Sequence, residues 1–251
     1  FRVVEHKVDS ESAAPRVCMT FSEDLQQAGV AYADFLRTPD QGLAVEAEGR
    51  QLCIDGVTHG ARYQFALRQG LPAASGEVLS KTVDLDIYVR DRSPTARFPG
   101  RGYVLPAGDV TALPIVTVNV NTLDLVLRKV GDRTVLRRLQ DGSFGRPLSR
   151  WQDAEFAETQ SVEIWRGTAE VDPELNVDVT TRLPLDEAVG PLAPGLYMLR
   201  AEVRDGPRDD AAASQWFVVS DLGLTSYQGN DGLTVFARSL RDVSAKSAAL
   251  V

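Results

Sequence analysis

The chain has 251 residues, of which 43% are hydrophobic and 25% charged, with a formal net charge of −8. This composition is ordinary for a globular protein of one or two domains, and an acidic chain is a poor partner for nucleic acid because phosphate repels it. All apolar runs are far shorter than the roughly 20 residues of a membrane-spanning helix, so no membrane insertion is expected.

Strand signals dominate the chain. Short alternating or β-branched runs predict strands at 15–21, 51–54, 62–67, 82–89, 114–120, 123–130, 162–165, 177–181, 196–203 and 214–219. Glycine- and proline-containing turns separate them, and short strands at this spacing are typical of β-sandwiches. The run 196–203 is apolar on both phases, which predicts a central strand covered on both faces.

Helical signals are scarce and fall at 22–29, 147–160 and 185–189. The first would be one or two turns capped by Ser22. The second is the strongest, because Ser149 is a suitable cap and Trp151, Ala154 and Phe156 could form an apolar side. The third is a short piece before a Gly-Pro stop.

Two breaks suggest three domains. Asp91-Arg92-Ser93-Pro94 follows one strand, and Ser220-Asp221 follows another. We therefore predict a first sandwich at 1–92, a second sandwich with a helical or hairpin insertion at 93–220, and the truncated start of a third at 221–251. Within the last part, strands at 222–227 and 233–240 would join around Asn230-Asp231-Gly232.

The two cysteines, Cys18 and Cys53, are too few for a zinc site without help. Strand alternation places Val17, Met19, Leu52 and Ile54 toward a core, so both thiols lie on the outward phase, where two strands of one sheet could join them. This favours a disulfide over free thiols. Closing such a loop would contribute about 4 kcal/mol in the chain-entropy model and would indicate an oxidising compartment.

Candidate catalytic histidines have no accompanying motif. His6 lies in a polar leading segment, and His59 lies in a turn between two strands. A nucleophile–base site needs a partner such as the serine of G-x-S-x-G, and the sequence lacks that motif. We interpret His59 as a turn residue and predict a protein that is not an enzyme.

Charged and glycine-rich clusters also have plain interpretations. Asp205, Asp209 and Asp210 lack the spacing of a calcium loop, and we interpret them as a solvated hairpin loop. Gly100-Arg101-Gly102 lacks the lysine and following helix of a phosphate loop. The basic cluster is interpreted as a solvated strand edge and turn, and it comprises Arg128, Lys129, Arg133, Arg137 and Arg138. No cofactor or metal is expected.

A series of motifs runs in order through nearly the whole chain. It includes Val17-Cys-Met-Thr-Phe-Ser, Leu52-Cys-Ile-Asp-Gly-Val-Thr-His-Gly, Phe98-Pro-Gly-Arg-Gly-Tyr, Glu163-Ile-Trp-Arg-Gly, Pro194-Gly-Leu-Tyr, and Trp216-Phe-Val-Val-Ser-Asp-Leu-Gly-Leu-Thr. Together these motifs resemble the N-terminal macroglobulin domains of a bacterial alpha-2-macroglobulin. The resemblance implies a string of fibronectin-like or immunoglobulin-like sandwiches in a periplasmic endopeptidase inhibitor. Such a parent traps proteases and is commonly lipid-anchored to a membrane.

Little of the family's mechanism carries over to these residues. Cys18 precedes Met-Thr-Phe and Cys53 precedes Ile-Asp-Gly, so neither begins the Cys-Glu-x-Gln thioester of the family, and no bait region is recognisable. The two cysteines match positions that look like a structural pair in the family's first domain, and an anchoring cysteine would precede Phe1. The implied role is a non-catalytic scaffold whose partners are adjacent domains and, through the parent, proteases. An extracellular immunoglobulin-like adhesion or ligand-binding module is the alternative, and an enzyme accessory domain is a third reading.

Overall fold

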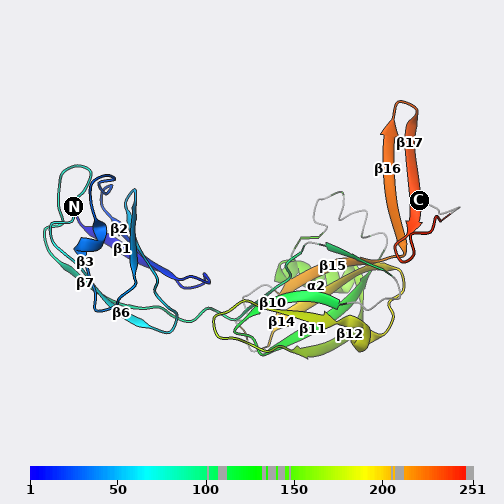
Figure 1. Ribbon diagram of the computed structural model, residues 1–251. Helices are drawn as coiled ribbons and strands as arrows, with labels where there is room; N and C mark the ends of the chain where they lie inside the picture. The colour runs from blue at the N-terminus through cyan, green and yellow to red at the C-terminus, as the bar shows by residue number, and fades with distance from the viewer. Residues whose placement is uncertain are drawn as a thin grey trace. The chain divides into compact units, whose positions relative to one another are not determined.

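The computed structural model of the chain (Figure 1) describes residues 1–100, 102–106, 112–131, 134, 140, 145–146, 148–204, 206 and 212–246. The chain divides into two compact units. Unit 1 comprises Phe1–Ser93 with Leu175–Val177, and unit 2 comprises Pro94–Glu174 with Asp178–Val251. The prediction of an all-β protein with tandem β-sandwiches and short helices is confirmed.

Unit 1 is a sandwich of two antiparallel sheets. The four-stranded sheet has the order β1-β2-β5-β4, and the three-stranded sheet has the order β3-β6-β7. The strands are β1 (Val3–Asp9), β2 (Arg16–Phe21), β3 (Leu36–Arg37), β4 (Ala44–Glu48), β5 (Gln51–Asp55), β6 (Arg62–Leu67) and β7 (Val83–Tyr88).

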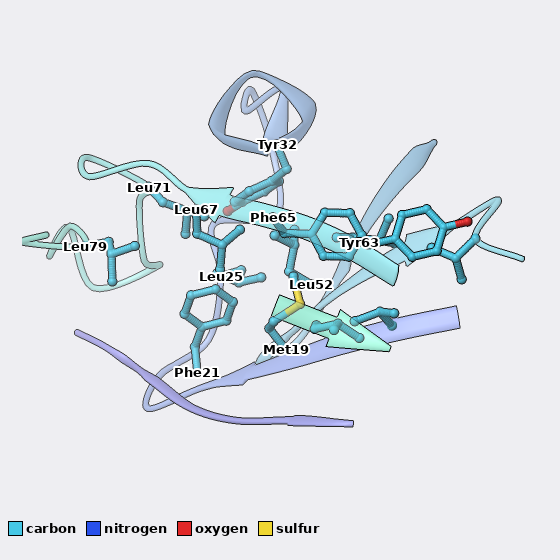
Figure 2. Packing of buried hydrophobic residues seen from close by; sticks show 14 of the residues in the cluster. Met19, Phe21, Leu25, Tyr32, Leu52, Tyr63, Phe65, Leu67, Leu71 and Leu79 are labelled. Atoms are coloured by element: carbon cyan, nitrogen blue, oxygen red, sulfur yellow. The ribbon is translucent and has the colours of Figure 1, made fainter. Parts of the chain in front are cut away.

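The core of unit 1 is built by strand alternation. Val17, Met19 and Phe21 of β2 point inward and are at most 1% exposed, and Tyr63 and Phe65 of β6 face them from the other sheet with their rings stacked at 5.6 Å. Figure 2 shows Met19, Phe21, Tyr63 and Phe65 gathered in this core. Because a one-residue slip would turn every one of them toward solvent, the burial fixes the register of both strands.

Two parts of unit 1 differ from the expectations. The segment 22–29 is not helical: Leu25 is fully buried, forms an isolated bridge with Ala73, and donates its N–H to the Gly49 carbonyl at 2.7 Å. The tertiary position of one leucine therefore overrides a weak local helical signal. Instead, a short 3₁₀ helix, η1, forms at Tyr32–Phe35. The polar leading segment that contains His6 forms β1.

Unit 2 contains a five-stranded sheet of order β12-β11-β14-β15-β9, a three-stranded sheet of order β13-β10-β8 and a hairpin, β16-β17. The strands are β8 (Thr95–Arg97), β9 (Gly102–Leu105), β10 (Ala112–Val118), β11 (Thr122–Val130), β12 (Ser161–Glu170), β13 (Val179–Pro184), β14 (Gly195–Val203), β15 (Ala213–Val219), β16 (Leu222–Gly229) and β17 (Gly232–Ser239). The helices whose bounds lie within the described residues are α2 (Arg150–Thr159) and α3 (Leu185–Val189).

The strand β14 is central and covered on both faces, as its doubly apolar pattern predicts. It pairs with β11 on one side and β15 on the other. Tyr197 and Leu199 enter the core between the two sheets, whereas Leu196 and Met198 enter a second core that includes Phe156 of α2. The five-stranded sheet is therefore packed by a sheet on one face and by a helix on the other.

Helix α2 confirms the predicted helix and its cap but corrects its apolar side. Ser149 and Gln152 form a reciprocal capping box. Phe156 is fully buried and meets Trp216 edge-to-face at 5.2 Å, whereas Trp151 is 73% exposed and Ala154 is also exposed. At 100° per residue, positions 151 and 154 lie on the side opposite 156, so the three cannot share one face.

The hairpin β16-β17 confirms the two strands expected at the end of the chain (Figure 1, orange). Leu224 stands opposite Ala237 and Gln228 stands opposite Leu233, and the leucines are 54% and 66% exposed. The division of the chain into two compact units includes this hairpin in unit 2. The division into three domains at 1–92, 93–220 and 221–251 stays a prediction.

Candidate functional site

The disulfide lies in the middle of the four-stranded sheet of unit 1. Cys18 of β2 and Cys53 of β5 are directly opposite each other in the antiparallel ladder, and their sulfur atoms are bonded. Their neighbours Val17, Leu52 and Ile54 are fully buried on the core side, so both cysteines point to the outer face. The bridge thus joins two strands that the sheet already pairs, and it closes the chain between β2 and β5.

A charged group lies beside the disulfide on the same outer face. Arg16 Nη2 is 3.1 Å from the Glu46 carboxylate and 2.9 Å from the Asp55 carboxylate. The Asp55 carboxylate, which also accepts a hydrogen bond from this guanidinium, is the main reason that the pKa of Arg16 is raised. This arrangement connects β2, β4 and β5 by charge.

A second polar cluster gathers at the end of unit 1 where β7 leaves the sandwich. Glu11 accepts hydrogen bonds from the Ser93 N–H and hydroxyl, both at 2.9 Å, and from Arg90 Nη2 at 2.7 Å. The Ser93 N–H is the largest cause that lowers the pKa of Glu11. Because the carboxylate binds three donors from 90–93, it holds this segment in one conformation.

His59 belongs to the same end of unit 1 and has a structural partner. Its Nε2 lies 3.0 Å from the carbonyl oxygen of Ser10, and the Ser10 hydroxyl accepts a hydrogen bond from Arg90 Nε at 2.9 Å. The imidazole therefore contacts the Ser10 main chain, whereas the Ser10 hydroxyl is engaged by Arg90. The geometry agrees with the interpretation of His59 as a turn residue.

The interpretation of Arg128 as a solvated residue is wrong. Arg128 is only 7% exposed, and its Nη1 lies 2.9 Å from Asp153 of α2. The other Asp153 oxygen lies 2.8 Å from Arg200 Nε, as an ion pair rather than a well-aligned hydrogen bond. Arg128 and Arg200 project from the face of β11 and β14 that α2 covers, so the helix supplies the anion that their burial requires. Lys129 is exposed.

Several sequence candidates lie outside the described residues: Arg101, Arg133, Arg137, Arg138, Asp205, Asp209 and Asp210. Across the described ranges, no group of three or more histidine, cysteine, aspartate or glutamate side chains is close enough to hold a metal ion. Within the same ranges, no helix has the length and apolar character to cross a membrane.

A hollow in unit 1 lies on the outer face of the β3-β6-β7 sheet. It is an open groove of about 790 Å³ with residues of all three strands and the turn after β3 in its lining. A smaller groove of about 380 Å³ in unit 2 is lined by residues of β12, β13 and α3, and Trp165, Leu183 and Leu185 supply its apolar part. The sequence patterns did not indicate either groove, because each is lined by residues of several elements that are distant in the sequence.

Comparison with known proteins finds similarity to macroglobulin domains. Residues 97–202 match the family described as the bacterial alpha-2 macroglobulin MG2 domain. The fold resembles the crystal structure of native alpha-2-macroglobulin from Escherichia coli spanning domains MG0-NIE-MG1, with a TM-score of 0.53 and 18% identity over 98% of this chain and 80% of that chain. A Salmonella alpha-2-macroglobulin mutant gives a TM-score of 0.60 at 18% identity over 95% of this chain and 14% of that one.

Sequence relatives agree with this class. The chain is 25% identical to the alpha-2-macroglobulin of E. coli K12 over 174 residues, which is 69% of the chain and 10% of the relative. It is 26% identical to that of Xylella fastidiosa 9a5c over 208 residues, 80% of the chain and 13% of the relative. The resemblance to N-terminal macroglobulin domains of bacterial alpha-2-macroglobulins is thereby confirmed, and the chain spans about a tenth of the length of these relatives.

Proposed function

We propose that this chain is the non-catalytic N-terminal scaffold of a longer periplasmic alpha-2-macroglobulin that inhibits endopeptidases by trapping them. The observation that carries the proposal is the MG2 family match at 97–202, within a chain that aligns along 98% of its length with macroglobulin-domain structures. The scaffold would present rigid sandwiches to the adjacent macroglobulin domains of the same parent, and the parent would meet the proteases.

The local chemistry supports a scaffold role. The contacts of Cys18, Glu11 and Arg128 all join structural elements to one another. An intramolecular disulfide persists in oxidising compartments, which supports a periplasmic location for the parent. The exposed leucines of β16-β17 support the view that this hairpin begins a third sandwich, because an isolated hairpin is marginal until another layer covers its apolar face.

Mixing each protein with trypsin tests the proposal. The parent should suppress cleavage of a large substrate such as casein while trypsin still hydrolyses a small chromogenic amide. The present chain alone, in tenfold molar excess, should change neither rate. Protection by this chain alone would contradict the scaffold role, and a parent without size-selective protection would contradict protease trapping. A reproducible glycan or protein ligand in array binding would instead favour the adhesion-module reading.

A further inference from the structure

The edge of β6 that faces β3 is only partly paired. β3 contributes just two residues to the ladder, Leu36 opposite Leu67 and Arg37 opposite Ala66, whereas β6 continues back to Arg62. The next residues of the chain are Thr38 and Pro39. Proline has no N–H to donate, and the Asp40 N–H turns back to the Thr38 hydroxyl at 3.2 Å, so the β3 segment leaves the sheet there.

The direction of the free main-chain groups follows from the ladder. The Arg68 N–H donates to the Phe35 carbonyl at 2.8 Å, and hydrogen-bonding groups of a strand alternate between its two neighbours. The groups of Gln64 and Arg62 therefore point to the same side as those of Arg68. No main-chain hydrogen bond joins Gln64 or Arg62 to a residue on that side within the described chain. Unit 1 thus has an unused strand edge.

The groove of about 790 Å³ lies at this edge. Its lining includes Thr38 and Pro39 at one side, Gln64 and Ala66 along β6, and Asp84 and Asp86 of β7, with three further lining residues, Arg37, Phe65 and Leu85. Ala66 has a small side chain. It stands opposite Arg37 of β3 on one side and opposite Asp84 of β7 on the other. A hollow of this kind accommodates a side chain that emerges from an added strand.

The charges of the groove indicate the kind of side chain that it accepts. Asp84 and Asp86 stand opposite Ala66 and Gln64 on the outer face, and both are exposed. Asp86 is paired with Arg62 at 3.0 Å, but no ion pair involves Asp84 in the part of the chain that the structure describes. Arg37 also lines the groove and lies in the row of Ala66 and Asp84. A lysine or arginine placed opposite Gln64 on a new strand would share this face, and its long side chain would extend across Gln64 of β6 toward the carboxylates of β7.

We propose that this edge binds an extended peptide segment that carries a lysine or arginine, added as an extra strand along 62–65 of β6. Main-chain hydrogen bonds to Arg62 and Gln64 supply the affinity, and the carboxylates of β7 select the basic side chain, which is the division of labour in other strand-addition sites. This inference concerns a peptide-binding edge of unit 1 and goes beyond the proposed scaffold role.

Amide hydrogen exchange of the full chain, followed by NMR, tests the edge directly. In the free chain the amides of Arg62 and Gln64 should exchange much faster than those of Tyr63 and Phe65, which face β7. The probe is the blocked peptide acetyl-Gly-Thr-Val-Lys-Val-Thr-Gly-amide at up to about 1 mM. It should slow exchange at Arg62 and Gln64 at least about tenfold, while a peptide with Glu in place of Lys should bind at least about fivefold more weakly.

Variants separate the two parts of the proposal. D84K should weaken binding of the lysine peptide about fivefold, whereas E48K, the same charge change on β4 of the other sheet, should leave it unchanged. D84N provides a milder change if D84K disturbs folding. Equal binding of the Lys and Glu peptides overturns the acidic selection. The proposal as a whole is overturned if 1 mM peptide does not slow amide exchange at Arg62 and Gln64. It is also overturned if the Gln64 amide is already protected in the free chain at every protein concentration. Protection that grows with protein concentration would overturn it too, because it would identify a second copy of the chain as the occupant.

Discussion

Asp153 of α2 lies 2.9 Å from Arg128 of β11, and both side chains are at most 14% exposed. This pair, with Arg200 on the neighbouring strand, anchors the helix to the sheet face that also carries the apolar side chains of the second core. A helix that docks through a single buried phenylalanine has few other contacts to fix its position, so the ion pair also specifies where along the sheet the helix docks. The relationship gives the first of four predictions.

Replacing Asp153 with asparagine should destabilise unit 2 by about 2–4 kcal/mol, because the buried Arg128 loses its carboxylate partner and Arg200 keeps only Glu202. The measurement is urea unfolding followed by tryptophan fluorescence, since all three tryptophans, Trp151, Trp165 and Trp216, belong to unit 2. The matched control is E155Q, which changes an exposed carboxylate on the same helix. A cost for D153N no larger than that of the control would show that the pair contributes no net stability.

The corrected face of α2 gives a second prediction. F156A should cost about 3–5 kcal/mol, because it removes a fully buried ring from its contact with Trp216. W151A should change stability by less than about 0.5 kcal/mol, because the indole is 73% exposed. The same unfolding experiment, followed by far-UV circular dichroism, compares the two variants. Equal losses would mean that Trp151 packs in solution, contrary to the structure.

Reduction of the disulfide should destabilise unit 1 selectively. In the chain-entropy model, a bridge between residues separated by 35 positions contributes about 4 kcal/mol by restricting the unfolded chain. Dithiothreitol should therefore lower the midpoint of the unit 1 transition, seen by circular dichroism, and leave the tryptophan-monitored transition of unit 2 in place. The C18S/C53S double variant should show the lowered midpoint with or without reductant. An equal shift of both transitions would contradict the assignment of the bridge to one unit.

The carboxyl group of Asp242, in the loop after β17, should titrate at an unusually low pH. Hydrogen bonds from the hydroxyl and N–H of Ser244 lower the pKa of Asp242 from 3.8 to about 2. A depressed pKa means that the ionised form stabilises the loop: the contribution is fully present above about pH 4 and is lost as pH falls through about 2. The carboxyl ¹³C shift of Asp242 follows this titration by NMR. S244A should move the midpoint up toward 3.8, and S226A on β16 should not move it.

Local patterns predicted the strongly alternating strands and the capped helix, but they did not reveal every element. The edge strand β1 alternates weakly and is mostly exposed, β4 alternates but has no buried residue, and β3 has only two residues, so none has a clear signal of its own. The local pattern predicts a helix around Leu25, because it contains no information about the bridge that Leu25 forms with Ala73. Short segments of this kind take their structure from neighbours that are distant in sequence.

By itself, the sequence determined the class of fold, the phase of each strong strand and hence the outward direction of Cys18 and Cys53, because alternation along a strand is a local property. Its ordered motifs also determined the resemblance to macroglobulin domains. Only the tertiary structure decided that β2 lies beside β5, that Arg128 is buried beneath α2, and that β3 leaves β6 after Arg37. Periodicity specifies which face a side chain takes, but neighbours are chosen by packing among segments that are far apart in the chain.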